Sequence, residues 1–165
     1  MRALVLIAVL FLSACGFSPV YGDKSFGNGS STVAGTLNQI RINPLADREG
    51  QFLRNALIDR FYGDGYPTNP LYALTVSPIK EQETAFDITV ESEATRYQLK
   101  ISTSIQLKDL NTGELILTRS LNGISSYNVL ESEFATRVSE QNAREAVLND
   151  LARQIEQHIA LTLNK

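Results

Sequence analysis

Cys15 is the only cysteine among the 165 residues, and its neighbours make it the clearest candidate for chemistry. It lies in the stretch LFLSACGFSPVYG, where Leu12, Ser13 and Ala14 precede it. A thiol can accept a diacylglycerol through a thioether bond, and small residues before it let a peptidase hold extended backbone in its cleft. This arrangement resembles the bacterial lipobox, so we expect Cys15 to be lipid-modified and to begin the mature chain. The alternative is a buried free cysteine at the end of an N-terminal helix.

The residues before Cys15 have the three parts of a secretory signal peptide. A short positive start precedes ten consecutive apolar residues at positions 3–12, and two small residues follow. Such a run is too short to span a bilayer, since a transmembrane helix needs about 20 residues. We predict a signal peptide over residues 1–14, a lipidated N-terminus and flexible tether over residues 15–35, and a single α+β lipoprotein domain over residues 36–165. The mature protein is then tethered to a membrane rather than spanning it.

The rest of the sequence offers little that could catalyse a reaction. His158 is the only histidine, and it flanks the apolar positions of the last predicted helix, so a packed or half-exposed ring is favoured over a base. No second histidine can complete a metal site. One group of acidic residues could supply the paired carboxylates that glycoside hydrolysis needs. A solvent-exposed hairpin is the better interpretation of that segment. This group consists of Glu81, Glu83, Asp87, Glu91 and Glu93.

The serines and glycines are equally uninformative about catalysis. No serine lies in a Gly-x-Ser-x-Gly turn, and no glycine-rich loop of the kind that holds phosphates is present. We therefore predict a protein that is not an enzyme and that needs neither a metal nor a cofactor.

Composition indicates one folded domain and excludes nucleic acid as a partner. Hydrophobic residues make up 43% and charged residues 20%, which is ordinary for a globular protein. The formal net charge is -3, and loss of the signal peptide removes Arg2, leaving 14 basic against 18 acidic residues, or -4. A protein that binds nucleic acid through its phosphates needs a basic stripe, which this composition does not supply.

Two hydrophobic periodicities predict the elements that position any site. Alternation predicts four strands, namely a short one around Ile40 and Ile42 that ends at Pro44, LYALTVSPI with an end or bend near Pro78, TRYQLKISTSIQLKD, and ELILTRSLNGIS after a turn at residues 111–113. Helical spacing predicts one helix from Asp47 to Gly63 and another from about Glu133 to Leu163. We expect a two-layer α+β sandwich, with two helices packed on one face of a mainly antiparallel four-stranded sheet whose other face is polar.

The order and spacing of these segments resemble the LPS-assembly lipoproteins, the LptE-like family, across nearly the whole mature chain. The resemblance is carried by the start CGFSPVYG, the helix EGQFLRNALIDRFYG, the strand ATRYQLKISTSIQL and the long helix EQNAREAVLNDLARQIEQHIALTL. It implies an outer-membrane lipoprotein on the periplasmic side that plugs a large LptD-like β-barrel translocon, and the pair would insert lipopolysaccharide into the outer leaflet. Gly16 fits release to the outer membrane, because the retention signal of many lipoproteins is an aspartate at that position.

The resemblance also implies candidate contacts to lipopolysaccharide, which the family makes through basic residues in loops at one end of the domain. Arg137 stands where one such cation is expected. The loop before the Tyr-Gln strand, where the other is expected, is acidic here, and its nearest base is Arg96. Lys100, on the polar side of the same strand, is the third candidate. The alternative for all three is an ordinary exposed cation.

Two other functions stay open from the sequence. An auxiliary periplasmic lipoprotein of an ABC-type phospholipid transport system would share the anchor and the small mixed fold. A lipid-anchored hydrolase is disfavoured by the missing nucleophile and base.

Overall fold

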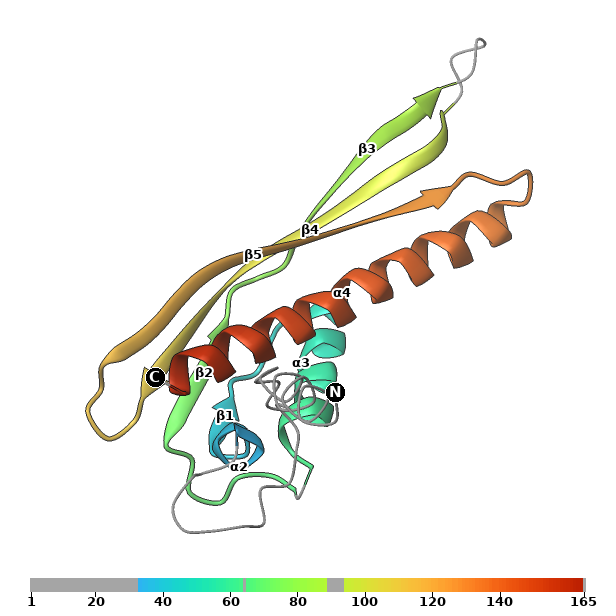
Figure 1. The fold of residues 1–165 in the computed structure, drawn as a ribbon. Coiled ribbons are helices and arrows are strands. Elements are labelled where there is room, and N and C mark those ends of the chain that lie inside the picture. The colour runs from blue at the N-terminus through green and yellow to red at the C-terminus, as the bar shows by residue number, and fades with distance from the viewer. Residues whose placement is uncertain (1–32, 64, 89–93, 165) are drawn as a thin grey trace, which may run out of the picture.

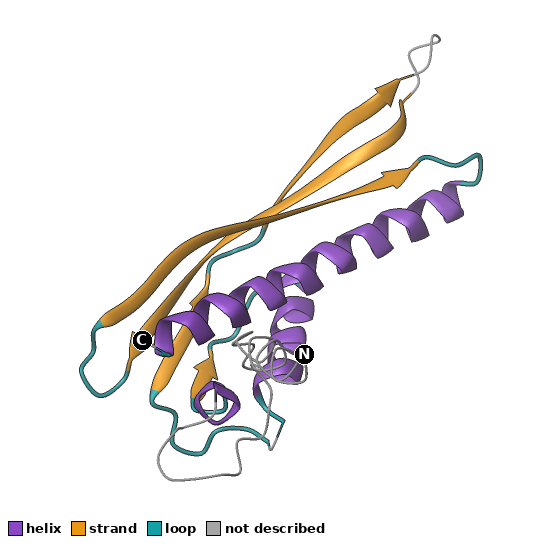
Figure 2. Cartoon of the chain, in the orientation of Figure 1, coloured by secondary structure: helices purple, strands orange, loops and turns teal. Residues whose placement is uncertain are grey.

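The computed structural model describes residues 33–63, 65–88 and 94–164. They form an α+β fold, as predicted, in which helices lie along one side of a long twisted sheet (Figure 1, Figure 2). In chain order the elements are α2 (Val33–Leu37), β1 (Ile40–Ile42), α3 (Arg48–Phe61), β2 (Tyr72–Val76), β3 (Lys80–Ile88), β4 (Ala94–Asp109), β5 (Leu115–Asn128) and α4 (Glu133–Leu163).

The sheet has five strands, so the expected four-stranded sheet is wrong in strand number; it is mainly antiparallel, as predicted, with one parallel pair. β2, β3 and β5 each pair with β4 in the antiparallel sense, whereas β1 pairs with β2 in parallel. Parallel neighbours need a crossover connection, which α3 supplies between β1 and β2. The unpredicted strand is β3, whose sequence KEQETAFDI is polar on both faces and lacks the apolar alternation of a half-buried strand.

β4 is the central strand, and its two faces differ as alternation predicted. Leu99, Ile101, Ile105 and Leu107 are fully buried beneath the helices. The intervening residues point to the opposite side, which we call the open face because no helix of the described chain covers it (Figure 1). The open face consists of Lys100, Ser102, Ser104, Gln106 and Lys108 of β4, the residues that pair with them on the neighbouring strands, and Arg41 of β1.

β2 and β3 pair with successive parts of the same edge of β4, and the segment between them has one extra residue. Val76 pairs with Ile105 and Lys80 pairs with Ser102, so three residues, 77–79, lie opposite two, 103 and 104. An extra residue of this kind is a β-bulge, and it exchanges the faces to which alternate residues point. Lys80 therefore points to the open face and Glu81 toward the helices. The end or bend predicted near Pro78 corresponds to the end of β2 and this bulge.

The helices bury the apolar face of the sheet in one continuous core. α4 has the predicted bounds, and its stripe of Leu148, Leu151, Ala152, Ile155 and Ile159 is fully buried. Ser132, at the N-terminal cap of α4, accepts a hydrogen bond from the Ala135 amide at 3.4 Å. Asp47 occupies the position before α3, but its side chain makes no capping hydrogen bond.

Two short segments complete the packing around β1. α2 was not predicted, and it begins at Val33, inside the segment assigned to the tether. Tyr62, just after α3, accepts a hydrogen bond from the Ile42 amide at 3.1 Å and donates one to the Ile40 carbonyl at 2.8 Å. Burial raises the pKa of the Tyr62 hydroxyl, which stays a donor to this strand edge.

Candidate functional site

One end of the molecule, which we call the distal end, gathers two of the three candidate cations. It comprises β3, residues 94–98 of β4, residues 125–128 of β5, the turn 129–132 and the first three turns of α4 (Figure 1). Arg96 is exposed on β4, where it pairs with Asn128 of β5 and with Asp87 of β3. Arg137 lies in the second turn of α4. The two arginines come from different elements and share this end.

The turn before α4 is held by local hydrogen bonds rather than by core packing. The Thr136 hydroxyl accepts a hydrogen bond from the Leu130 amide at 2.9 Å and lies 3.2 Å from the Leu130 carbonyl. These contacts fix a turn that presents apolar side chains to solvent, since Phe134 is 77% exposed and Leu130 is 47% exposed. The distal end thus displays apolar groups beside cations, a combination that suits an amphipathic anion.

Arg137 is occupied by a carboxylate of its own helix. Its guanidinium lies 2.6 Å from Glu133, and both side chains are largely exposed, at 75% and 80%. An exposed pair of this kind contributes only about 0.3–0.5 kcal/mol to stability. An external phosphate could therefore replace Glu133 at little cost to the fold.

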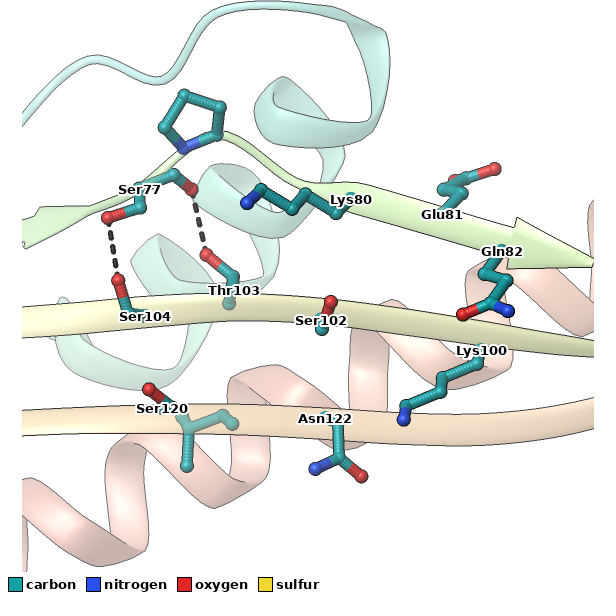
Figure 3. Close-up of a pocket in the computed structure, with 12 residues that line it drawn as sticks. Ser77, Lys80, Glu81, Gln82, Lys100, Ser102, Thr103, Ser104, Ser120 and Asn122 are labelled. Atoms are coloured by element: carbon teal, nitrogen blue, oxygen red, sulfur yellow. Dashed lines mark hydrogen bonds between the residues drawn. The ribbon is translucent and has the colours of Figure 1, made fainter.

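Lys100 lies away from the distal end, in a shallow depression of ≈ 690 Å³ on the open face (Figure 3). The depression forms at the β2–β3 bulge, where the Ser77 and Ser104 hydroxyls lie 2.7 Å apart and Thr103 donates to the Ser77 carbonyl at 2.7 Å. Lys80 lies on the neighbouring strand (Figure 3). Sequence reasoning missed Lys80, because the bulge that turns it to this face leaves no alternation signal.

The acidic residues of β3 have structural partners that argue against paired catalytic carboxylates. Both Glu81 oxygens lie 3.1 Å from Arg144 Nε, and another Arg144 nitrogen lies 2.6 Å from Glu140. Glu83 accepts a hydrogen bond from the Tyr127 hydroxyl at 3.3 Å. These contacts join β3 to α4 and β5, so Glu81 and Glu83 both help to hold the distal end together.

Tyr127 is a buried polar residue at the junction of β5, β3 and α4. The ring is 7% exposed and stacks on Tyr97 with 5.7 Å between centroids. Burial, together with the negative charges of Glu83 and Glu140, raises the pKa of the Tyr127 hydroxyl to about 12. The hydroxyl is thus a hydrogen-bond donor at neutral pH and not a base.

The remaining predicted residues take no part in a common site. His158 is half-buried on α4, as expected for a packed ring. Within residues 33–63, 65–88 and 94–164, no group of three or more histidines, cysteines or carboxylates could hold a metal ion. In the same ranges no helix is long and apolar enough to cross a membrane. Cys15, Glu91 and Glu93 lie outside the described residues, as does the side chain of Asp87.

Three solved structures with the same fold are bacterial lipoproteins. A putative lipoprotein from Caulobacter crescentus is 25% identical, with a TM-score of 0.65 over 80% of this chain and 95% of that one. The rare lipoprotein B from Shewanella oneidensis is 10% identical, with a TM-score of 0.58 over 74% of this chain and 92% of that one. A minor lipoprotein from Acinetobacter baumannii is 20% identical, with a TM-score of 0.53 over 74% of this chain and 88% of that one.

The family assignment comes from the sequence of the domain itself. No curated protein sequence gave a match. The family described as LptE, lipopolysaccharide-assembly, matches residues 37–163, which span every element from the end of α2 to the end of α4. Because this match covers most of the chain and confirms the resemblance seen in its segments, the protein belongs to the LptE family of lipopolysaccharide-assembly lipoproteins, which are not enzymes.

Proposed function

We propose that the protein is anchored by lipid on Cys15 to the periplasmic side of the outer membrane and plugs an LptD-like β-barrel translocon. The observation that carries this proposal is the LptE-family match over residues 37–163. The polar open face supports it, because the interior of a large outer-membrane barrel is polar and wet. In this role the protein assembles the translocon that inserts lipopolysaccharide into the outer membrane.

Purification of the complex tests the partnership. The full-length lipoprotein, tagged at its C-terminus, would be purified from detergent-solubilised membranes, with an unrelated tagged lipoprotein as the control. We expect a large β-barrel protein of the LptD type in a stable complex with this chain and not with the control. Recovery of the proteins of an ABC-type phospholipid transporter, without a barrel, would instead support the alternative function.

The anchor is tested separately from the partner. Mass spectrometry of the native protein should find cleavage before Cys15 and a lipid-modified cysteine at the new N-terminus. Cys15→Ala should yield a folded domain that fractionates with the periplasm when the barrel is absent, because the core of the described chain begins at Leu37. An uncleaved, unmodified N-terminus on the native protein would contradict the proposed anchoring.

We also propose that Arg96 and Arg137 contact lipopolysaccharide at the distal end, whereas Lys100, the third candidate, lies away from that end on the open face. The arginines could meet its phosphates, while the exposed Phe134 and Leu130 could meet its acyl chains. Arg96→Glu with Arg137→Glu should weaken binding of purified lipopolysaccharide by about tenfold or more, because two attractive charge pairs become repulsive. Arg48→Glu with Arg153→Glu makes the same charge change away from this end and serves as the control. Equal binding by both double variants would contradict this assignment.

A further inference from the structure

The open face concentrates positive charge in a chain whose net charge is negative. It carries Arg41, Lys80, Lys100 and Lys108, all of them exposed. Neither Asp nor Glu occurs among the β4 residues of this face or among the described residues that pair with them. Since the formal net charge of the chain is -3, this face has the opposite sign to the whole molecule.

The β2–β3 bulge contributes directly to this separation. Without the extra residue in segment 77–79, alternation would turn Glu81 outward and Lys80 toward α4. With the bulge, Glu81 reaches Arg144 of α4 at 3.1 Å, and Lys80 stands on the open face. Bulges commonly re-aim side chains next to functional surfaces.

The cations of the open face are not neutralised within the part of the chain that the structure describes. Among the described residues, none of the four makes an ion pair with a carboxylate. Four arginines elsewhere are paired within the chain, namely Arg60 with Glu156, Arg137 with Glu133, Arg144 with Glu81 and Glu140, and Arg153 with Asp150. The charge of the open face is therefore available to an outside partner.

We propose that the open face docks on an acidic protein surface, the carboxylate-bearing inner wall of the barrel partner, an inference that rests on the proposed function. Complementary charge across an interface steers the encounter and fixes the orientation of the partners. Short polar side chains such as Ser102, Ser104 and Asn122 lie beside Lys80 and Lys100 and leave room for side chains of the wall (Figure 3). The protein thus enters the barrel with its sheet toward the acidic sector of the wall.

The spacing of the cations favours a protein wall over a lipid. Lys100 and Lys108 are eight residues apart on one strand, which corresponds to about 27 Å. A phosphate group is matched by cations that converge on it, whereas these are distributed along an extended surface. Ile124 and Leu115 are the exposed large apolar side chains of the described open face, too few to hold acyl chains.

Charge reversal tests this docking in the full-length lipidated chain. Lys80→Glu with Lys100→Glu should reduce the barrel protein recovered with the tagged chain by about tenfold, because two attractive contacts become repulsive. The control is Arg48→Glu with Arg153→Glu, which makes the same charge change at two exposed arginines of α3 and α4 and should leave recovery near that of the unaltered chain. Circular dichroism melting curves establish that both double variants fold.

Photo-crosslinking identifies what covers the face without changing its charge. p-Benzoyl-phenylalanine would replace Asn122 on the open face or, as the matched control, Asn149, an exposed asparagine of α4. We expect the Asn122 position to give an adduct with the barrel protein. An adduct with lipopolysaccharide at this position, or a barrel adduct from Asn149 alone, would overturn the inference. This readout also decides the matter if the charge-reversed chain fails to fold.

The two proposals fail in different ways. If the unaltered chain recovers no barrel protein, the proposed function is wrong. If it recovers the barrel and the Lys80 and Lys100 reversal recovers as much, the proposed function stands and the docking face is wrong.

Discussion

The two ends of this molecule are stabilised by different interactions, apolar packing at one end and polar contacts at the other. Around the crossing of α3 and α4, apolar side chains such as Leu53, Leu74 and Leu151 are completely buried. At the distal end, the contacts between α4 and the sheet are polar, with Arg144 between Glu81 and Glu140, and Tyr127 on Glu83. Apolar burial supports global stability, whereas partly exposed polar contacts hold local arrangements that open at lower cost. The end that displays the candidate lipid contacts is therefore the end that can rearrange without unfolding the core.

Truncation of a core side chain should have the largest effect. Leu151→Ala should lower the free energy of unfolding by about 3 kcal/mol, because it leaves a cavity among fully buried neighbours. Phe134→Ala at the distal end, where the ring is 77% exposed, should change stability by no more than about 0.5 kcal/mol. Urea unfolding monitored by circular dichroism measures both values. Similar losses in the two variants would show that the distal end shares the core.

Gly123 marks the boundary between the two regions. A Cβ on this residue of β5 would lie 2.7 Å from Val147 Cγ1 of α4, so a side chain here requires the Val147 side chain to move. Gly123→Ala should lower the free energy of unfolding by about 1–3 kcal/mol through overpacking. Val147→Ala in the same chain should recover part of that loss, and a double-mutant cycle measures the coupling. Strictly additive losses would contradict a direct clash.

The core was predicted well from the sequence, because the spacing of apolar residues along a strand or helix indicates which of its faces is buried. The alternation of β4 and the stripe of α4 were both confirmed, down to the bounds of the last helix. β1 and β2 were both predicted as strands, but their parallel pairing was not, since a three-residue strand carries no information on its neighbour. α2, with five residues, is equally short for a helical pattern.

The distal end was harder to predict because its contacts are polar. β3 has charged residues toward both sides, and the partner of Glu81 lies on α4, 63 residues further along the chain. The common face of Arg96 and Lys100 followed from their spacing of four on one strand. Lys80 could not be added to that face, because a one-residue bulge reverses the alternation and has no distinctive sequence beyond Pro78.

Removal of Arg144 should loosen the distal end more than the core. Its side chain is 15% exposed, and Arg144→Met would leave Glu81 and Glu140 without their shared cation. We expect a loss of about 1–2 kcal/mol, since the charges left behind are only partly hydrated. Hydrogen exchange should accelerate in β3 and the first turns of α4, while amides of β1 and β2 keep their protection.

Arg153→Met is the matched control for this variant. Arg153 pairs with Asp150 on the same helix, and its side chain is 60% exposed. An exposed pair contributes about 0–1 kcal/mol, so exchange at the distal end should not change. Equal acceleration in both variants would show that the loss of charge, and not the link between β3 and α4, is responsible.

The smallest effect is expected at Tyr127, and it depends on pH. The folded pKa of about 12 lies above the usual value near 10, so the unfolded chain loses this proton first as the pH rises. The resulting stability is fully present below pH 10 and is lost progressively as the pH rises toward 12. Tyr127→Phe should cost about 0.5–1.5 kcal/mol at neutral pH, where the hydrogen bond to Glu83 is intact. The difference between the two chains should shrink in alkaline solution, as urea unfolding at several pH values can measure.

Glu83→Gln separates burial from charge as the cause of the Tyr127 shift. Burial contributes most to the raised pKa, and the Glu83 carboxylate adds to it. The substitution removes the negative charge and keeps a hydrogen-bond acceptor, so the pKa of Tyr127 should fall from about 12 toward its usual value without reaching it. NMR titration of the chain labelled with ¹³C at tyrosine Cζ gives a separate signal for each tyrosine, and the Tyr127 signal reports the pKa of its hydroxyl. An unchanged titration would mean that burial alone raises the pKa of Tyr127 and that the Glu83 carboxylate of β3 has no electrostatic effect on this residue of β5. The distal end would then be held by packing, as the core is.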